Sequence, residues 1–245
     1  MITRMEITLS AEKNTEAFRA EWAYRLYADY LKDLPQAYAE KLHKNNRKPV
    51  SQHLKKWEDN IVWTVNLLGE EAEEMIFPVL QKKDVYHIEQ EVKVLDRKIE
   101  KIEDADTLFS MAADGNSVHK LEFETATAFK SQGRYVNLPT ISLIFQNLIQ
   151  KWNSCFPEIL IEDENREGMN AMVEGIYCPK YSLHNKIYTL KGTCIHGFSG
   201  EMVLKNQLTG FHKELADVLL LFAKYSGIGI KTTLGMGGIQ HIFQA

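Results

Sequence analysis

The sequence predicts an α+β fold made of two tandem domains, and length, composition and the order of elements carry this prediction. A chain of 245 residues suits two domains that each bury a core of their own. Hydrophobic and charged fractions of 44% and 25% are typical of a globular protein. In both halves the periodicity gives the order strand, helix, strand, strand, helix, strand. This is the ferredoxin-like βαββαβ unit, so we expect one such domain at residues 1–115 and a second at residues 116–245.

The first half alternates between period-two and helical segments. The first helical segment ends at a proline, which cannot continue a helix. The second helical segment begins with acidic residues, which favour a helix N-terminus. The expected elements are a strand over 2–9, a helix over 14–34 ended by Pro35, a strand after Pro49, a strand over 61–68, a helix over 69–80 and one long or broken strand over 84–103.

The second half repeats this order after a polar segment, residues 104–120, which we interpret as a domain boundary or a hairpin. A proline at a helix start and glycines at turns mark its elements. The expected elements are a strand over 121–129, a turn at 131–133, a helix from Pro139 to Trp152, a charged loop over 162–168, strands over 187–192 and 193–204, a helix over 208–225, a glycine-rich loop and a strand over 239–243.

The charge pattern limits the binding partners. The formal net charge is −4 and the sequence pI is about 6.1, which argues against a protein that coats nucleic acid without specificity. Residues 41–56 nevertheless contain six Lys or Arg residues, two His residues and no carboxylate. Basic side chains with Asn, Ser and Gln between them are what phosphate contacts require, although a solvated loop has the same composition.

A glycine-rich loop lies close to the C-terminus. Five of the thirteen residues from Gly227 to Ile239 are glycine, and Lys231, Thr232 and Thr233 lie between the two glycine clusters. Backbone N–H groups without a neighbouring Cβ can approach an anion, so the loop is a candidate phosphate site. A nucleotide-binding loop is disfavoured because the order here is helix, loop, strand.

Cysteine usage and hydropathy indicate the cellular compartment. The three cysteines are far apart and form no C-x-x-C pair, so we expect reduced thiols and neither a zinc site nor a disulfide. No segment reads as a signal peptide or a membrane span. We expect a cytoplasmic protein without membrane partners.

The chain resembles the CRISPR-associated repeat-processing endoribonucleases, the RAMP-superfamily enzymes that cut precursor CRISPR RNA within each repeat. The resemblance rests on the Leu42-His43 pair expected in the loop after the first helix, the segment Lys48-Pro-Val-Ser51, the threonine-containing strand over 121–129 and the glycine-rich loop. It covers most of the chain. Val50 departs from the family pattern, in which an aromatic residue usually follows Lys-Pro.

The resemblance implies a metal-independent endoribonuclease with Tyr27, His43 and Lys48 as catalytic residues. His43 would act as general base or acid, Tyr27 as its partner, and Lys48 would stabilise the charge on the phosphorus oxygens. Attack by the 2′-hydroxyl would leave a 2′,3′-cyclic phosphate and a 5′-hydroxyl, and no cofactor or metal is expected. The expected RNA-binding residues are Lys44, Arg47, Lys55, Lys56, Gly227, Gly229, Lys231, Thr232, Thr233, Gly235 and Gly237.

Several alternatives stay open. Tyr24 or Tyr30 could replace Tyr27, and Lys44 or Arg47 competes with Lys48. His53 lies in the same basic segment, but we expect its strand to turn it toward solvent or RNA and away from the scissile bond.

The main functional alternative is a non-catalytic subunit that holds guide RNA in a CRISPR effector complex. A metal-dependent nuclease is disfavoured because no clustered carboxylate set such as D-x-D appears in a strand context. Effector-complex partners and a homodimer also stay open.

Overall fold

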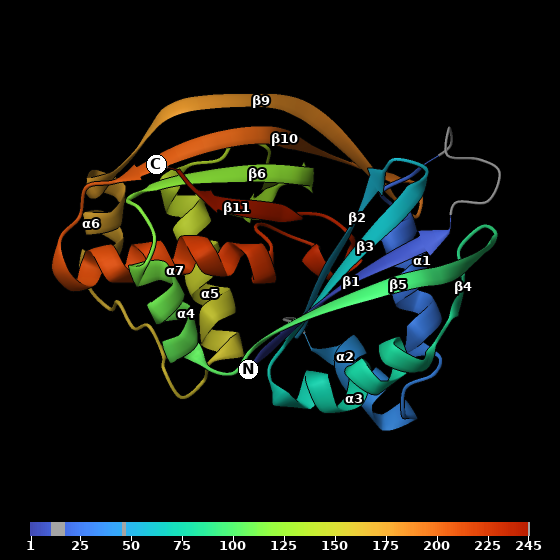
Figure 1. The fold of residues 1–245 in the computed structure, drawn as a ribbon. Helices are drawn as coiled ribbons and strands as arrows, with labels where there is room; N and C mark the ends of the chain where they lie inside the picture. The colour runs from blue at the N-terminus through green and yellow to red at the C-terminus, as the bar shows by residue number, and fades with distance from the viewer. Residues whose placement is uncertain (11–17, 46–47, 245) are drawn as a thin grey trace.

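The computed structural model describes residues 1–10, 18–45 and 48–244, and its main architecture is two antiparallel sheets, each with helices on one face (Figure 1). The first sheet has the strand order β2-β3-β1-β5-β4 and the second the order β11-β6-β10-β9. Apart from the short β4, both sheets follow the order of the second, third, first and fourth strands of a βαββαβ unit. The expectation of two tandem ferredoxin-like folds is confirmed.

The N-terminal half alternates as expected, with one helix more than the sequence predicted. Its elements are β1 (Ile2–Ser10), α1 (Trp22–Leu31), α2 (Gln36–Lys44), β2 (Val50–Trp57), β3 (Asn60–Leu68), α3 (Glu70–Lys82), β4 (Val85–His87) and β5 (Glu91–Ile102). The C-terminal half comprises α4 (Ala105–Ala113), β6 (Val118–Thr127), β7 (Phe129–Ser131), β8 (Arg134–Val136), α5 (Ile141–Cys155), α6 (Glu167–Gly175), β9 (Ile176–Leu190), β10 (Thr193–Asn206), α7 (Gly210–Ser226), the 3-10 turn η2 (Thr232–Leu234) and β11 (Ile239–Phe243).

Three helices were not predicted, because each is short and lies in a polar segment. Helix α2 starts directly after Pro35, its N-cap, whose ψ of 132° is not helical, and α1 has already ended at Leu31. Helix α4 occupies the segment interpreted as a boundary or hairpin; it starts at an Asp104 cap and packs against α7. Helix α6 begins at the end of the expected charged loop, and the strand after it starts at Ile176, earlier than the expected residue 187.

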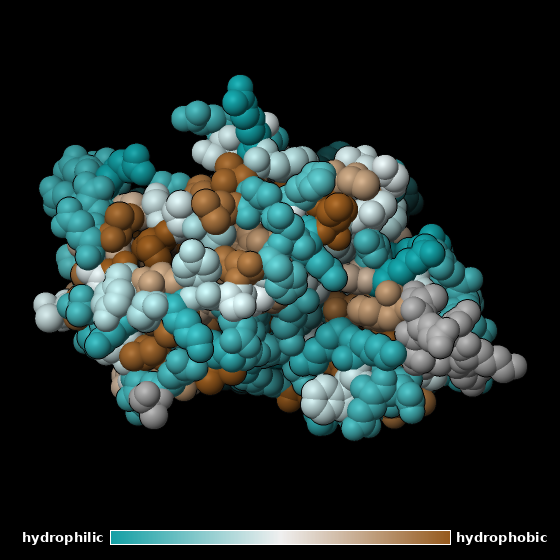
Figure 2. All heavy atoms as spheres, turned by 90° about the horizontal axis from the view of Figure 1, so that it is seen from above, coloured by the Kyte–Doolittle hydropathy of each residue, from teal (hydrophilic) through white to brown (hydrophobic). Residues whose placement is uncertain are grey.

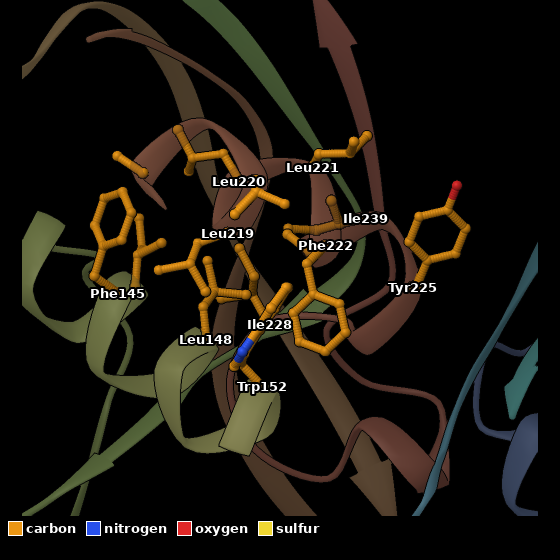
Figure 3. Packing of buried hydrophobic residues seen from close by; sticks show 14 of the residues in the cluster. Phe145, Leu148, Trp152, Leu219, Leu220, Leu221, Phe222, Tyr225, Ile228 and Ile239 are labelled. Atoms are coloured by element: carbon orange, nitrogen blue, oxygen red, sulfur yellow. The ribbon is translucent and has the colours of Figure 1, made fainter. Parts of the chain in front are cut away.

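The core of the C-terminal domain lies between the second sheet and helices α5 and α7. Apolar residues three and four apart put Ile144, Leu148 and Trp152 on the buried face of α5. Phe222 of α7 contacts the Trp152 ring edge to face, with the ring centroids 5.4 Å apart (Figure 3). The same close-up shows Ile228, the second residue of the glycine-rich loop, inside this core. The loop is therefore anchored at its start.

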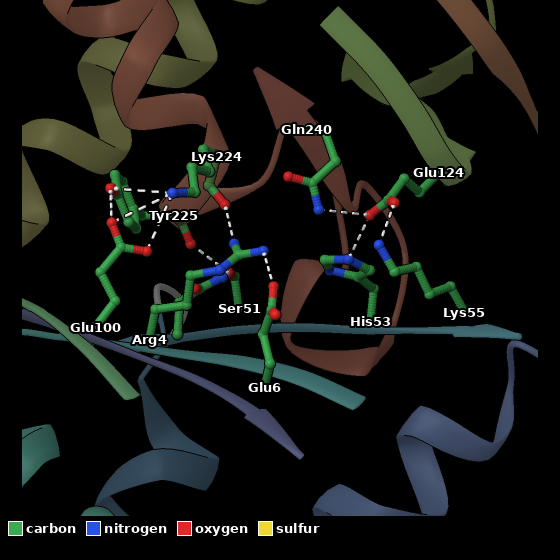
Figure 4. Close-up of polar contacts among 11 residues, drawn as sticks. Arg4, Glu6, Ser51, His53, Lys55, Glu100, Glu124, Lys224, Tyr225 and Gln240 are labelled. Atoms are coloured by element: carbon green, nitrogen blue, oxygen red, sulfur yellow. Dashed lines mark hydrogen bonds and ion pairs between the residues drawn. The ribbon is translucent and has the colours of Figure 1, made fainter. Parts of the chain in front are cut away.

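Polar side chains of the first sheet join the two domains (Figure 4). Arg4 of β1 donates to the carbonyl oxygen of Lys224 at 3.1 Å, and His53 Nε2 lies 2.8 Å from a carboxylate oxygen of Glu124 on β6. His53 is only 2% exposed, so the expectation that it faces solvent or RNA is wrong. The helix-free face of β2 packs on the C-terminal domain, and a Cβ on Gly238 would lie 2.3 Å from the His53 ring.

The surface seen from above mixes small apolar patches with hydrophilic side chains (Figure 2). In the part of the chain that the structure describes, no helix is long and apolar enough to cross a membrane. The three cysteines are free thiols, with Cys155 buried and Cys194 exposed.

Candidate functional site

A cleft of about 1350 Å³ lies between the two domains. The N-terminal domain contributes the end of α2 with Lys41 and Lys44, the segment at Lys48, and the start of α3. The C-terminal domain contributes one face of α5 and residues 229–234 of the glycine-rich loop. The basic segment and the glycine-rich loop, about 185 residues apart in the sequence, thus form opposite walls of one cleft.

His43 lies in the last turn of α2, next to the Lys44 that lines the cleft. Its neighbour Leu42 is 2% exposed and packs into the domain core, while the His43 side chain is exposed. The expectation that the Leu-His pair lies in a loop is wrong. Leu42 and Tyr38 are four residues apart, so they form the buried face of a short helix that the basic composition obscured.

Lys48 fixes the end of α2. Its ammonium donates to the carbonyl oxygens of Leu42 and Asn45, at 2.8 and 3.2 Å. These belong to the carbonyl groups that a helix leaves without a partner at its C-terminus, where a cation is favourable. Burial lowers the pKa of Lys48 from its ordinary value. The lysine therefore holds its charge close to His43 and keeps the helix end that carries His43 in place.

The glycine-rich loop is buried, and its amides are used inside the protein. Gly227 donates to the carbonyl of Ala223 at 2.9 Å, Gly229 to the side chain of Asn147 at 2.7 Å, and Gly237 to the carbonyl of Ala126 at 3.0 Å. The expectation that these three amides are open to an anion is therefore wrong.

The glycines instead permit close packing of the loop. A Cβ on Gly237 would lie 2.0 Å from the carbonyl oxygen of Ile228, and one on Gly235 would lie 2.6 Å from the Cβ of Ala23. Lys231 and Thr232 are partly exposed and line the cleft. Thr233 is buried, and its hydroxyl donates to the carbonyl of Val50 at 2.7 Å. The loop thus presents the side chains of Lys231 and Thr232 to the cleft, while the amides of Gly227, Gly229, Gly237 and Gly238 are bonded within the protein.

The remaining expected RNA-binding residues do not all lie at the cleft. Lys44 is exposed at the cleft, whereas Lys55 lies on β2 and forms an ion pair with Glu124 at 3.1 Å. Lys56 is exposed further along β2. Arg47 lies outside the described residues. Among the residues with a described position, no group of three or more His, Cys, Asp or Glu side chains could hold a metal ion.

Comparison with known proteins gives the family. Residues 121–239 match the family model described as CRISPR-associated endoribonuclease Cas6. The chain is also 30% identical over 224 residues to the CRISPR-associated endoribonuclease Cas6 of Streptococcus thermophilus, an alignment that covers 89% of this chain and 90% of that protein. The chain belongs to the Cas6 family.

Two further matches agree with this membership. The Cas6 of Mycobacterium tuberculosis is 24% identical over 249 residues, covering 98% of this chain and 78% of that protein. A structure described as a Cas6 product complex has a TM-score of 0.80 at 18% identity and covers 99% of this chain and 100% of its own. At that identity the structural match shows a shared fold, and the resemblance drawn from the sequence motifs is confirmed.

The three tyrosines of α1, which the sequence offered as partners of His43, are buried or partly buried. Tyr27 is 5% exposed and packs edge to face on Tyr30, which is fully buried. Burial, with a smaller effect of Tyr38, raises the pKa of Tyr27 to about 12, so its phenol keeps its proton at neutral pH. Tyr24 is partly exposed and lies under the ammonium of Lys191. No hydrogen bond among the described residues joins any of these three phenols to His43.

Sequence reasoning missed two residues of this Cas6 cleft, Asn147 and Lys151. They lie four apart on α5 and bind the glycine-rich loop: Asn147 accepts from the Gly229 amide, and Lys151 donates to the carbonyls of Ser226 and Gly227, at 3.0 and 2.9 Å. Burial lowers the pKa of Lys151 to about 7. The one signal in the sequence was two polar residues at helical spacing within an apolar helix, which by itself indicates only a solvated stripe.

Proposed function

We propose that this Cas6 family member is a metal-independent endoribonuclease that cuts precursor CRISPR RNA within its repeats. The observation that carries the proposal is the cleft between the domains, with the exposed His43 in the last turn of the helix that supplies Lys41 and Lys44 to it. An RNA strand in this cleft would bring its phosphates near Lys44, Lys48 and Lys231, although Glu70, Glu71 and Glu158 also line the cleft. Family membership supports the class of reaction, and the exposed position of His43 next to the cleft-lining Lys44 supports its proposed role.

In this proposal His43 exchanges the protons. Its imidazole takes the proton of the 2′-hydroxyl or gives one to the leaving 5′-oxygen, because histidine is the side chain most often used for proton transfer in catalysis. The exposed ring is free of hydrogen bonds within the described residues, so an RNA ribose can approach it. Attack of the 2′-oxygen on phosphorus breaks the bond to the 5′-oxygen and yields a 2′,3′-cyclic phosphate and a 5′-hydroxyl.

Lys48 and Tyr27 support this reaction in different ways. Lys48 holds a cation at the end of α2, where it can offset the charge that develops on the phosphorus oxygens. Tyr27, with its protonated phenol in the core beneath α2, serves as the orienting partner of the His43 helix. We place the RNA contacts of the glycine-rich loop on Lys231 and Thr232, which line the cleft.

The test is cleavage of repeat RNA in EDTA by the wild type, His43→Ala and a control, His212→Ala. His212 is also exposed, but it lies at the start of α7 away from the residues that line the cleft. We expect cutting at one position by the wild type and the control, and a rate about 10²- to 10⁴-fold lower for His43→Ala. A 2′-deoxy group at the cut site should abolish cutting.

Two results would contradict the proposal. Cutting that disappears in EDTA and returns with Mg²⁺ would show metal-dependent chemistry. Tight binding of the repeat without cutting by the wild type would make the chain an RNA-holding subunit, the alternative that the sequence left open.

A further inference from the structure

Lys151 has an unusual position for a lysine on an otherwise apolar helix. It lines the cleft from the C-terminal domain, and its ammonium lies where α7 ends and the glycine-rich loop begins. The carbonyl oxygens of Ser226 and Gly227 accept two hydrogen bonds from it. Both belong to the C-terminal end of α7, whose partial negative charge favours a cation. The side chain is thus held in one place.

An ammonium group has three donors, and the described residues accept only two of them. Since the side chain lines the cleft, the third donor is available to an acceptor inside the cleft. Five lysines line the cleft against three carboxylates, so the cleft as a whole favours an anion as the acceptor. The lysines are Lys41, Lys44, Lys48, Lys151 and Lys231, and the carboxylates are Glu70, Glu71 and Glu158. Ser154, one turn further along α5, adds a hydroxyl to the same wall.

Asn147 completes the arrangement one turn earlier on α5. Its side-chain oxygen accepts from the Gly229 amide at 2.7 Å, and its amide nitrogen lies 3.4 Å from the Gly229 carbonyl. Together Asn147 and Lys151 bind the backbone at three residues within four positions, Ser226, Gly227 and Gly229. Gly227 and Gly229 have φ of 65° and 86°, a conformation that few other residues adopt, so the loop needs such fixed points.

We propose that Lys151 is an RNA-contacting residue of this cleft, which binds a backbone phosphate with the donor that the loop carbonyls leave open. Asn147 is the positioning residue that holds the loop beside it. This inference rests on the proposed function, because it takes RNA as the occupant of the cleft. A phosphate next to the ammonium also offsets the cost of burying the charge of Lys151.

The experiment measures the affinity for repeat RNA between about 50 and 200 mM salt, where phosphate contacts set the slope. RNA with 2′-O-methyl groups throughout cannot be cut, so binding is measured alone. The variants are Lys151→Met, Lys151→Gln and Lys151→Arg, with Lys93→Met as the control. Lys93 is an exposed lysine on β5 that does not line the cleft. Thermal unfolding of each variant identifies any that fail to fold.

We expect Lys151→Met and Lys151→Gln to bind about tenfold more weakly and to lower the slope of log affinity against log salt by about 0.7, the value for one phosphate on a single strand. Lys151→Gln keeps hydrogen-bond donors for the loop, so it remains informative if the Met variant unfolds. Lys151→Arg and Lys93→Met should keep the wild-type slope. Asn147→Ser should weaken binding without changing the slope, because it removes no charge.

An unchanged slope for both neutral Lys151 variants would overturn the proposed phosphate contact, whatever their affinity. A lowered slope for Lys93→Met as well would show a general charge effect and overturn it too. The proposed function fails separately: if the wild type does not cut unmodified repeat RNA but the slopes behave as expected, Lys151 remains an RNA contact of a non-catalytic protein.

Discussion

The ion pair between His53 and Glu124 joins the two domains, and replacing Glu124 by glutamine tests how much it stabilises the fold (Figure 4). Burial alone would raise the pKa of Glu124, but the hydrogen bond and charge of His53, with Lys55, lower it from 4.5 to about 2. The carboxylate is only 15% exposed, so solvent screens these interactions little. At 1.36 kcal/mol for each pKa unit, the difference of about 2.5 corresponds to about 3 kcal/mol.

The pH dependence of this effect has a defined sign. The pKa of Glu124 is lower in the folded than in the unfolded chain, so the stabilisation is complete above pH 4.5 and is lost as the pH falls toward 2. Glu124→Gln keeps the shape and a hydrogen-bond acceptor but removes the charge. We expect a free energy of unfolding up to about 3 kcal/mol lower near pH 5, below the ordinary pKa of a histidine side chain, and a difference from the wild type that shrinks below pH 4.5.

Urea unfolding at several pH values measures this difference, because the midpoint falls with stability at a constant slope. The matched control is Glu201→Gln on the neighbouring strand, since Glu201 pairs with Lys120 at 3.0 Å but is 51% exposed. An exposed pair contributes about 0.2 to 1 kcal/mol, so the control should change little. A loss below about 1 kcal/mol for Glu124→Gln, or a loss that does not depend on pH, would refute the reasoning.

Three further predictions concern the cleft and the loop. Lys48→Met removes two hydrogen bonds that a charged group donates to the end of α2. It should lower the free energy of unfolding, measured with urea, by about 1.5 to 3 kcal/mol and should also slow repeat cleavage. An unchanged stability would contradict the capping role. Gly237→Ala should lower the melting temperature far more than Gly133→Ala, because φ is 68° at Gly237 and the new Cβ would lie 2.0 Å from a carbonyl oxygen. At Gly133 φ is 79° but the surrounding space is open, so the alanine there costs only about 1 to 2 kcal/mol of backbone strain. Equal losses would show that the close contact does not matter. Tyr27→Phe keeps the ring in the core and should leave the melting temperature within a few degrees of the wild type while slowing cleavage, and unchanged cleavage kinetics would remove Tyr27 from the proposed site.

The sequence by itself determined the order of the four strands and two helices that make up each of the two ferredoxin-like units. Alternation and helical periodicity located β1, β3, α3, α5, α7 and β11, because a half-buried strand or helix must repeat its apolar residues at the period of its own geometry. It also identified the basic segment and the glycine-rich loop as separate features. The short helices were not predicted because one or two turns of apolar periodicity are hidden by charged neighbours, as in α2 with Tyr38 and Leu42.

Only the tertiary structure decided how these features meet. Periodicity along a chain carries no information about which elements from different domains face each other, so the cleft and its α5 wall with Asn147 and Lys151 could not be predicted. The same reason explains His53, whose alternating position shows that it lies on one face of β2 but not that another domain covers that face. The glycines were visible in the sequence, whereas the partners of their amides depend on the packing of the loop against α5 and β6.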